Sequence, residues 1–420
     1  MNNSMRTPCP ECGRVLDGER FERDGALYVR RQCPEHGEQI VRLSSDADLY
    51  RRSEAASVSE RLPAGDLRPF WGTASRFITT LALDVTNRCN LNCPICFADA
   101  NAEVIEPTLE ELERIVPQAP AKGFRPNLAL VGGESTVRPD LPQIVELVRA
   151  KGYEPRLNSN GLALSDEGLL RELRRAGLRW VILQIDGLDP EISIKFRGRD
   201  LTAHKDRVLE LLERHGFLVH FAMMVVKGTN DDQVGAILRR AMDLPHVRRV
   251  SFYPQSVVGR LDEHSERTDA ADVLRAIERT TDGQVTPEDV LRFKEMTRRA
   301  FALTHHPLLR PRPCIFPFIL QNQGGRLLPI SRLFQARYGL SHPGQWLRLL
   351  AQLPGLARYD GGDFSSDLLI CNIEKFYDND AFDLDAGLNC HHVYLEGRGA
   401  FPFCYYNSFV RPGGSWPMGC

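Results

Sequence analysis

Three cysteines, Cys89, Cys93 and Cys96, lie within the segment DVTNRCNLNCPICFADAN, separated by three and then two residues. A cubane iron-sulfur cluster normally takes four thiolates, so a compact trio leaves one iron open to coordinate a small molecule. A structural zinc knuckle is the alternative, but it needs four ligands and this segment contains no further Cys or His. The spacing therefore predicts a 4Fe-4S cluster that takes part in chemistry.

Polar groups and glycines follow the next expected strands at the point where each strand ends. They are Gly132, Gly133, Glu134, Asn158, Asn160, Gln184 and Asp186. Two adjacent glycines let the backbone approach a ligand closely, and the carboxylate suits an ammonium group. A Gly-Gly-Glu sequence alone marks a turn more often than a site. Because the carboxyl ends of parallel strands meet at one edge of a sheet, these groups together predict a single site.

The elements that must position these residues alternate between strand and helix. We expect strands over residues 77–84, 127–131, 155–158, 179–185, 217–226 and 247–253. We expect helices over residues 108–116, 141–151, 167–176, 203–215 and 232–242. Six such units favour an α/β fold with a parallel sheet and right-handed crossovers, forming a partial (β/α)6 TIM barrel. A doubly wound open sheet is the competing architecture.

Cysteines near the start of the chain form a second group. Cys9 and Cys12 lie in CPECG, and Cys33 and His36 lie in QCPEHGE, with a hairpin-like stretch between the two motifs. Three thiols and an imidazole complete a tetrahedral site for one zinc or iron ion. In a short polar segment with few core residues, such a site is usually structural. We therefore predict a small N-terminal metal knuckle.

A third group of cysteines lies near the end of the chain. Cys314, Cys371, Cys390 and Cys404 could bind one auxiliary 4Fe-4S cluster, which normally takes four thiolates. Alternatively, some of them are buried as small hydrophobic residues. The neighbouring pair His391 and His392 is expected to face solvent rather than a cluster.

Length and composition set the outer limits of the interpretation. The 420 residues carry a formal net charge of −2, which gives no electrostatic footprint for binding nucleic acid. No apolar run is long enough to span a bilayer, and the N-terminus lacks the apolar core of a signal peptide. We expect a cytoplasmic protein, possibly membrane-peripheral. The expected divisions are a metal-binding knuckle over residues 1–45, a linker over 46–73, the core over 74–300 and a Cys-rich segment over 301–420.

The cysteine trio, followed after the next strand by Gly132-Gly133-Glu134, resembles the radical S-adenosylmethionine (SAM) superfamily. The resemblance implies that Cys89, Cys93 and Cys96 ligate the cluster and that its open iron chelates SAM. It also implies that Gly133 and Glu134 hold the SAM ammonium group, with the polar groups after the next strands as further contacts to SAM or substrate. One electron from the reduced cluster would cleave SAM to a 5′-deoxyadenosyl radical. A low-potential donor, such as a flavodoxin or ferredoxin, would supply that electron.

The whole layout, from CPECG through CPICFA and LQIDG to PFCYYN, resembles the tetraether lipid synthase family and its bacterial relatives. That resemblance implies radical chemistry at an unactivated carbon, and a lipid chain is our preferred substrate. A pterin or other small-molecule methylase, a peptide- or protein-modifying radical enzyme and a non-catalytic metal scaffold remain alternatives. An acyl chain requires an apolar cavity, whereas a pterin requires a short cavity lined by hydrogen-bonding groups.

Overall fold

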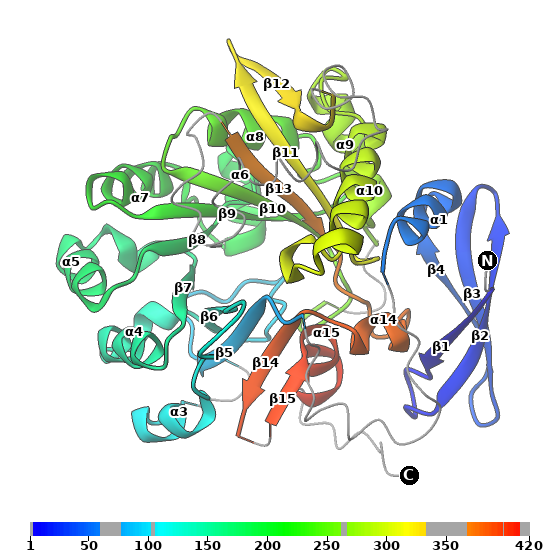
Figure 1. The fold of residues 1–420 in the computed structure, drawn as a ribbon, viewed down its shortest axis with the longest axis horizontal. Helices are drawn as coiled ribbons and strands as arrows, with labels where there is room; N and C mark the ends of the chain where they lie inside the picture. The colour runs from blue at the N-terminus through cyan, green and yellow to red at the C-terminus, as the bar shows by residue number, and fades with distance from the viewer. Residues whose placement is uncertain are drawn as a thin grey trace.

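The structure is a computed structural model that describes residues 3–58, 77–101, 106–261, 267–332, 368–397 and 399–411 (Figure 1). The N-terminal unit contains β1 (Ser4–Pro8), β2 (Val15–Arg23), β3 (Ala26–Cys33), β4 (Gly37–Ser44) and α1 (Ala47–Ala55). The central strands are β5 (Thr80–Thr86), β6 (Asn127–Gly132), β7 (Glu154–Ser159), β8 (Trp180–Gln184), β9 (Leu218–Val225) and β10 (Val247–Pro254).

The helices of the central unit are α3 (Leu109–Ile115), α4 (Leu141–Ala150), α5 (Glu167–Ala176), α6 (Pro190–Arg197), α7 (Thr202–Arg214), α8 (Val234–Met242), α9 (Ala270–Thr280) and α10 (Pro287–Thr304). Short turns are η1 (Ser135–Val137), η2 (Leu162–Ser165) and η3 (Pro307–Leu309). The C-terminal segment contains β11 (Ile315–Gln323), β12 (Arg326–Pro329), β13 (Leu368–Glu374), α14 (Leu384–Leu388), β14 (His392–Glu396), β15 (Gly399–Pro402), α15 (Phe403–Tyr405) and η4 (Tyr406–Val410).

Helix ends follow the local sequence. Thr108 caps α3, with its side chain accepting from the Glu111 backbone while the Glu111 side chain reaches back to the Thr108 backbone. The α5 helix begins after its N-cap residue Asp166. It ends at Ala176, and the C-cap residue Gly177 has a φ of 100°, which favours glycine. These signals explain why the predicted helix boundaries agree with the structure to within two residues for α3, α4, α5, α7 and α8.

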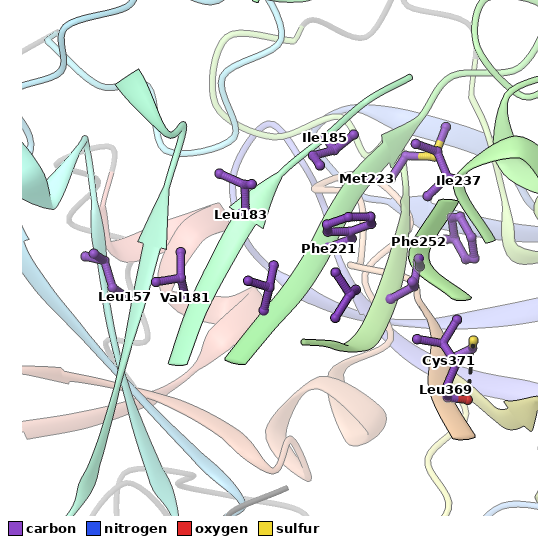
Figure 2. Packing of buried hydrophobic residues seen from close by; sticks show 14 of the residues in the cluster. Leu157, Val181, Leu183, Ile185, Phe221, Met223, Ile237, Phe252, Leu369 and Cys371 are labelled. Carbon is purple, nitrogen blue, oxygen red and sulfur yellow. Dashed lines mark hydrogen bonds between the residues drawn. The ribbon is translucent and has the colours of Figure 1, made fainter. Parts of the chain in front are cut away.

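The main hydrophobic core lies between the large sheet and the helices around it. Leu157, Val181, Leu183, Phe221 and Phe252 project from successive strands, and Figure 2 shows them in line. Leucine, valine and phenylalanine at these positions are almost fully buried, so each side chain adds on the order of 1.5–3 kcal/mol of stabilisation through burial. Strand order and register are therefore fixed by the apolar face that each strand turns toward the helices.

The C-terminal segment completes the large sheet at both sides of the predicted core. The order of its eleven strands is β12-β11-β13-β10-β9-β8-β7-β6-β5-β14-β15. β13 is parallel to β10, with Val250 opposite Cys371, and β14 is parallel to β5, with Leu81 opposite Val393. The six strands predicted from sequence thus become part of a larger, open sheet. Residues far apart in the sequence can therefore line one interior.

The expected division at residue 300 falls inside α10, so chain continuity carries the core directly into the C-terminal segment. The expected linker begins with α1, which Asp46 caps through a hydrogen bond from the Leu49 backbone. Lys294 of α10 donates to Ser53 of α1 over 2.6 Å, which ties the helix to the central unit. The rest of that linker, from residue 59 to 73, lies outside the described residues. None of the helices described is both long and apolar enough to cross a membrane.

The small N-terminal sheet brings the predicted knuckle together. Ligand atoms of Cys9, Cys12, Cys33 and His36 all lie within 4.8 Å of one another. His36 Nδ1 is 3.6 Å from Cys9 Sγ and 3.5 Å from Cys33 Sγ, and the Cys12 and Cys33 sulfurs are 3.8 Å apart. Tetrahedral bonds of about 2.0–2.3 Å to one zinc ion give separations of this size. The residues therefore fit a single tetrahedral metal ion.

Replacing Cys9 with Ala tests whether this metal is structural. The apolar cluster of the small sheet consists of only a few side chains, among them Met5, Leu27, Val29 and Leu43, so metal binding should contribute much of its stability. We expect the Cys9→Ala protein to lose one metal ion per chain by elemental analysis and to become protease-sensitive within residues 1–45. Iron bound elsewhere should be retained. A variant that keeps full metal content and protease resistance would contradict a structural site, and exposed Glu38→Gln serves as the control.

Candidate active site

The cysteine loop after β5 opens onto a cavity of about 350 Å³ inside the large sheet. Cys89, Cys93 and Cys96 all line this cavity, as the sequence predicts. The Leu91 backbone donates to Cys89 Sγ and the Ala100 backbone to Cys96 Sγ, each over 3.4 Å. Donors of this kind stabilise metal-bound sulfur.

Electrostatics in the loop require a compensating positive group. Burial raises the pKa of the Cys89 thiol to about 11, and the charges of Glu134, Cys93 and Cys96 act in the same direction. Three thiolates whose charges act on one another are costly unless a metal binds them. The converging donor set therefore fits a cluster held by three cysteines, which would leave one iron open.

Gly132 and Gly133 allow the end of β6 to pack tightly against the cysteine loop. Gly133 donates to the Thr86 carbonyl over 2.7 Å, and Glu134 donates to the Arg88 carbonyl over 2.9 Å. A Cβ atom on Gly133 would lie 2.1 Å from the Arg88 oxygen. The close approach that we predicted for a ligand is thus, in this structure, an approach to the loop itself.

Glu134 is 2% exposed and packs against that loop. Its Oε1 accepts from the Thr136 and Ser159 hydroxyls over 2.6 and 2.9 Å, whereas Oε2 accepts from the Asn160 backbone over 2.7 Å. A carboxylate oxygen has about two acceptor sites, so Oε2 retains capacity for one further donor. The geometry suits an ammonium group at that oxygen.

The other predicted polar residues take different positions. Asn158, Asn160 and Gln184 line the cavity, and Asn160 Nδ2 donates to Asn90 of the cysteine loop over 2.8 Å. Asp186 instead lies behind the cavity wall in a buried ion pair with Arg197, at 2.8 Å. Its carboxylate is occupied by this pair, so Asp186 positions Arg197 rather than presenting itself to a ligand.

Arg197 is a site residue that sequence reasoning missed. It lines the cavity, and although burial opposes its charge, the charges of Asp186 and Cys93 leave the pKa of Arg197 raised. The guanidinium is therefore a permanent positive charge beside one of the three thiols. No pattern in the helix PEISIKFR distinguishes it from a surface arginine before the fold is known.

A second missed group forms the polar interior of the cavity. It consists of Arg156, His220, Arg249, Glu374 and His392, which line the cavity together with the predicted Asn158. The signal was available, because several of these residues alternate with apolar ones inside strands such as LVHFAMMV. Alternation in a parallel strand marks the face turned away from the helices. His392 was expected to face solvent, but β14 carries it into this interior.

Aromatic side chains form one wall of the cavity. We call Phe97, Phe376, Phe403 and Tyr394 the aromatic wall. The ring centroids of Phe97 and Phe376 are 4.8 Å apart, those of Phe376 and Phe403 are 4.9 Å apart, and those of Phe403 and Tyr394 are 5.0 Å apart. Phe97 follows Cys96 directly, so the wall runs from the cysteine loop to the C-terminal strands.

The C-terminal cysteines divide into two sets. Cys314 and Cys404 belong to one apolar cluster, and the charge of Cys390 raises the pKa of both thiols in addition to burial. Cys371 is separate. It points from β13 into the main core, where its sulfur contacts the Leu369 carbonyl at 3.8 Å (Figure 2). Because Glu374, three residues later, faces the cavity, Cys371 faces the opposite side of the strand. The predicted grouping of four cysteines thus becomes a group of three.

Comparisons with known proteins agree with this geometry. A family model described as "Radical SAM superfamily" matches residues 83–241, and one described as "HMPTM N-terminal zinc ribbon domain" matches residues 1–45. The chain is 33% identical over 488 residues to 7,8-dihydro-6-hydroxymethylpterin dimethyltransferase of Methanocaldococcus jannaschii, covering 98% of this chain and 94% of that protein.

Two more distant similarities were found. GTP 3',8-cyclase of Syntrophomonas wolfei is 31% identical over 191 residues, covering 43% of this chain and 56% of the cyclase. The crystal structure of Streptococcus suis SuiB bound to S-adenosylmethionine is 20% identical with a TM-score of 0.42, covering 49% of this chain and 47% of that chain.

These findings confirm the resemblance at the level of the superfamily, with its implied 4Fe-4S cluster and SAM. The zinc ribbon match agrees with a metal at the N-terminal knuckle. The finer resemblance to the tetraether lipid synthase family is not supported, because the relative that matches nearly the full chain is named for a pterin. On the motif residues, the fold and this full-length similarity, the chain belongs to the radical SAM superfamily of enzymes.

Proposed function

We propose that this enzyme acts on a reduced pterin as a radical SAM methylase. The observation that carries the proposal is the polar interior of the cavity, where His220 Nδ1 and Asn158 Oδ1 are buried without partners among the described residues. An acyl chain offers no donor to these atoms, so it would leave them unpaired. The full-length similarity to a pterin dimethyltransferase supports the same substrate class. This proposal replaces our preference for a lipid.

Different residues along the cavity have different roles in the proposed reaction. Cys89, Cys93 and Cys96 would hold the cluster, and Glu134 Oε2 would accept from the SAM ammonium group. A cluster held there would supply the one electron that reductive cleavage of SAM needs. Arg197, held by Asp186, places a fixed positive charge beside Cys93. The aromatic wall excludes water from the space between the cysteine loop and the polar interior.

We further propose that Cys314, Cys390 and Cys404 hold an auxiliary cluster. Cys404 is buried and Cys314 and Cys390 are half-buried, and the charge of Cys390 acts on the pKa of the other two thiols. Burial of three mutually repelling thiolates is unfavourable without a metal to neutralise them. A low-potential flavodoxin or ferredoxin would supply the electron that the chemistry needs.

Deuterium transfer tests the substrate class. The reduced enzyme is incubated anaerobically with SAM and either deuterated 7,8-dihydro-6-hydroxymethylpterin or deuterated phospholipid, and deuterium is measured in the released 5′-deoxyadenosine. We expect transfer from the pterin, because only that substrate satisfies the polar interior. Transfer from the phospholipid alone would contradict the proposal. Omission of SAM is the control.

Iron analysis of two cysteine variants tests the auxiliary cluster. Cys404→Ser should lower iron by about four atoms per chain, the content of one cubane. Cys371→Ser is the matched control, because its sulfur lies in the main core away from the other three. It should therefore retain the iron of the unmodified enzyme. Equal iron in the Cys404 variant and the unmodified enzyme would overturn the assignment.

A further inference from the structure

Two side chains of the polar interior, His220 and Glu374, are joined through the buried Ser251 by hydrogen bonds. His220 Nε2 lies 2.8 Å from Ser251 Oγ, and Ser251 Oγ lies 3.2 Å from Glu374 Oε1. Asn372 Nδ2 contacts the same carboxylate oxygen over 3.3 Å. The chain of contacts crosses from β9 through β10 to β13, so it depends on the C-terminal strand that completes the sheet.

The single hydroxyl proton of Ser251 determines which ring nitrogen of His220 carries a proton. An ionised Glu374 can only accept, so the serine donates to it and must accept from His220 Nε2–H. Burial lowers the pKa of His220 well below its ordinary value, so the imidazole carries one proton. That proton is on Nε2, which makes Nδ1 an acceptor.

This acceptor is buried without a partner. His220 is 5% exposed, and its Nδ1 makes no hydrogen bond within the part of the chain that the structure describes. Asn158 Oδ1 is likewise buried without a donor, and both residues line the cavity. Together with Glu374 Oε2, these two atoms form a set of acceptors in a cavity that Arg156 and Arg249 also line. A ligand that satisfies them must present several N–H groups, because buried polar atoms are normally paired.

We propose that Glu374 Oε2 accepts from the exocyclic amino group of the substrate's aminopyrimidinone edge, with His220 Nδ1 accepting a further N–H from the same ring system. The inference rests on the proposed pterin substrate and names the residues that select it. In an aminopyrimidinone, the ring N–H and the exocyclic amino group lie side by side. Glu374 Oε1 already accepts from Ser251 and Asn372, so Oε2 is the carboxylate oxygen with capacity for a ligand donor. The aromatic wall offers a flat surface against which the bicyclic ring can stack.

A pterin and a lumazine, which are similar rings, should differ in their affinity for this cavity. A lumazine carries an oxygen where a pterin carries the exocyclic amino group, so it places an acceptor against the Glu374 carboxylate. One hydrogen bond to the charged group is lost and a repulsion replaces it. Glutamine at position 374 has one donor and one acceptor, which match the lumazine edge better than the pterin edge.

Equilibrium binding of 6-hydroxymethylpterin and 6-hydroxymethyllumazine, measured by calorimetry in the presence of SAM, tests the inference. The unmodified enzyme should bind the pterin at least about tenfold more tightly, the ratio expected for one charge-assisted hydrogen bond. Glu374→Gln should weaken pterin binding by a similar factor and reverse or abolish the preference. Glu172→Gln, on the exposed face of α5, should change neither affinity.

The outcomes separate this inference from the proposed function. Equal binding of both rings by the unmodified enzyme would overturn the recognition by Glu374 while leaving a pterin substrate possible, and no folded variant is needed for that comparison. A folded Glu374→Gln protein that keeps the full preference for pterin would overturn it in the same way. Failure of the unmodified enzyme to bind either ring, together with SAM cleavage that pterin does not affect, would instead remove the pterin substrate itself.

Discussion

Backbone packing between the end of β6 and the cysteine loop is the contact on which the active site depends. The loop follows β5 and has little regular structure, so its position is set by its neighbours. Hydrogen bonds from Gly133 and Glu134 to the carbonyls of Thr86 and Arg88 hold it against the sheet. Any side chain at Gly133 would collide with Arg88, so the contact requires glycine. The same contact places Glu134 in the lining of the cavity that the three cysteines share.

The second constraint is the completion of the sheet by the C-terminal segment. Parallel pairing of β13 with β10 and of β14 with β5 brings Glu374 and His392 to an interior that β7, β9 and β10 also line. Charged groups of both signs line that interior, among them Arg156, Arg249 and Glu374. Because a charge or polar atom is expensive to bury alone, this lining favours the polar ligand that we propose.

Much of the core could be predicted from sequence, and the reasons are local. Apolar runs such as NLALV, helix caps such as Thr108 and glycines such as Gly177 each encode a strand, a start or an end within a few residues. The cysteine trio and the N-terminal knuckle were recognisable because metal ligands recur at short spacings. The structure places both groups where those spacings imply.

The features that could not be predicted depend on long-range pairing. Nothing in the sequence near Glu374 indicates that β13 pairs with β10, more than a hundred residues away. The position of Glu374 in the cavity could therefore not be predicted. The face of a strand to which Cys371 belongs depends on the same pairing, because a shift of one residue exchanges the two faces. Asp186 was expected at the site, but its partner Arg197 lies on a separate helix whose position only the fold determines.

Release of 5′-deoxyadenosine tests the central claim, that the three-cysteine loop holds a cluster which cleaves SAM. The unmodified enzyme, purified and reduced without oxygen and supplied with excess SAM, should be brown and should release 5′-deoxyadenosine. Cys93→Ala should release none, because the cluster needs all three thiolates, whereas Cys371→Ala should retain the activity. Colourless unmodified protein that contains only zinc, or undiminished release from the Cys93 variant, would contradict the account.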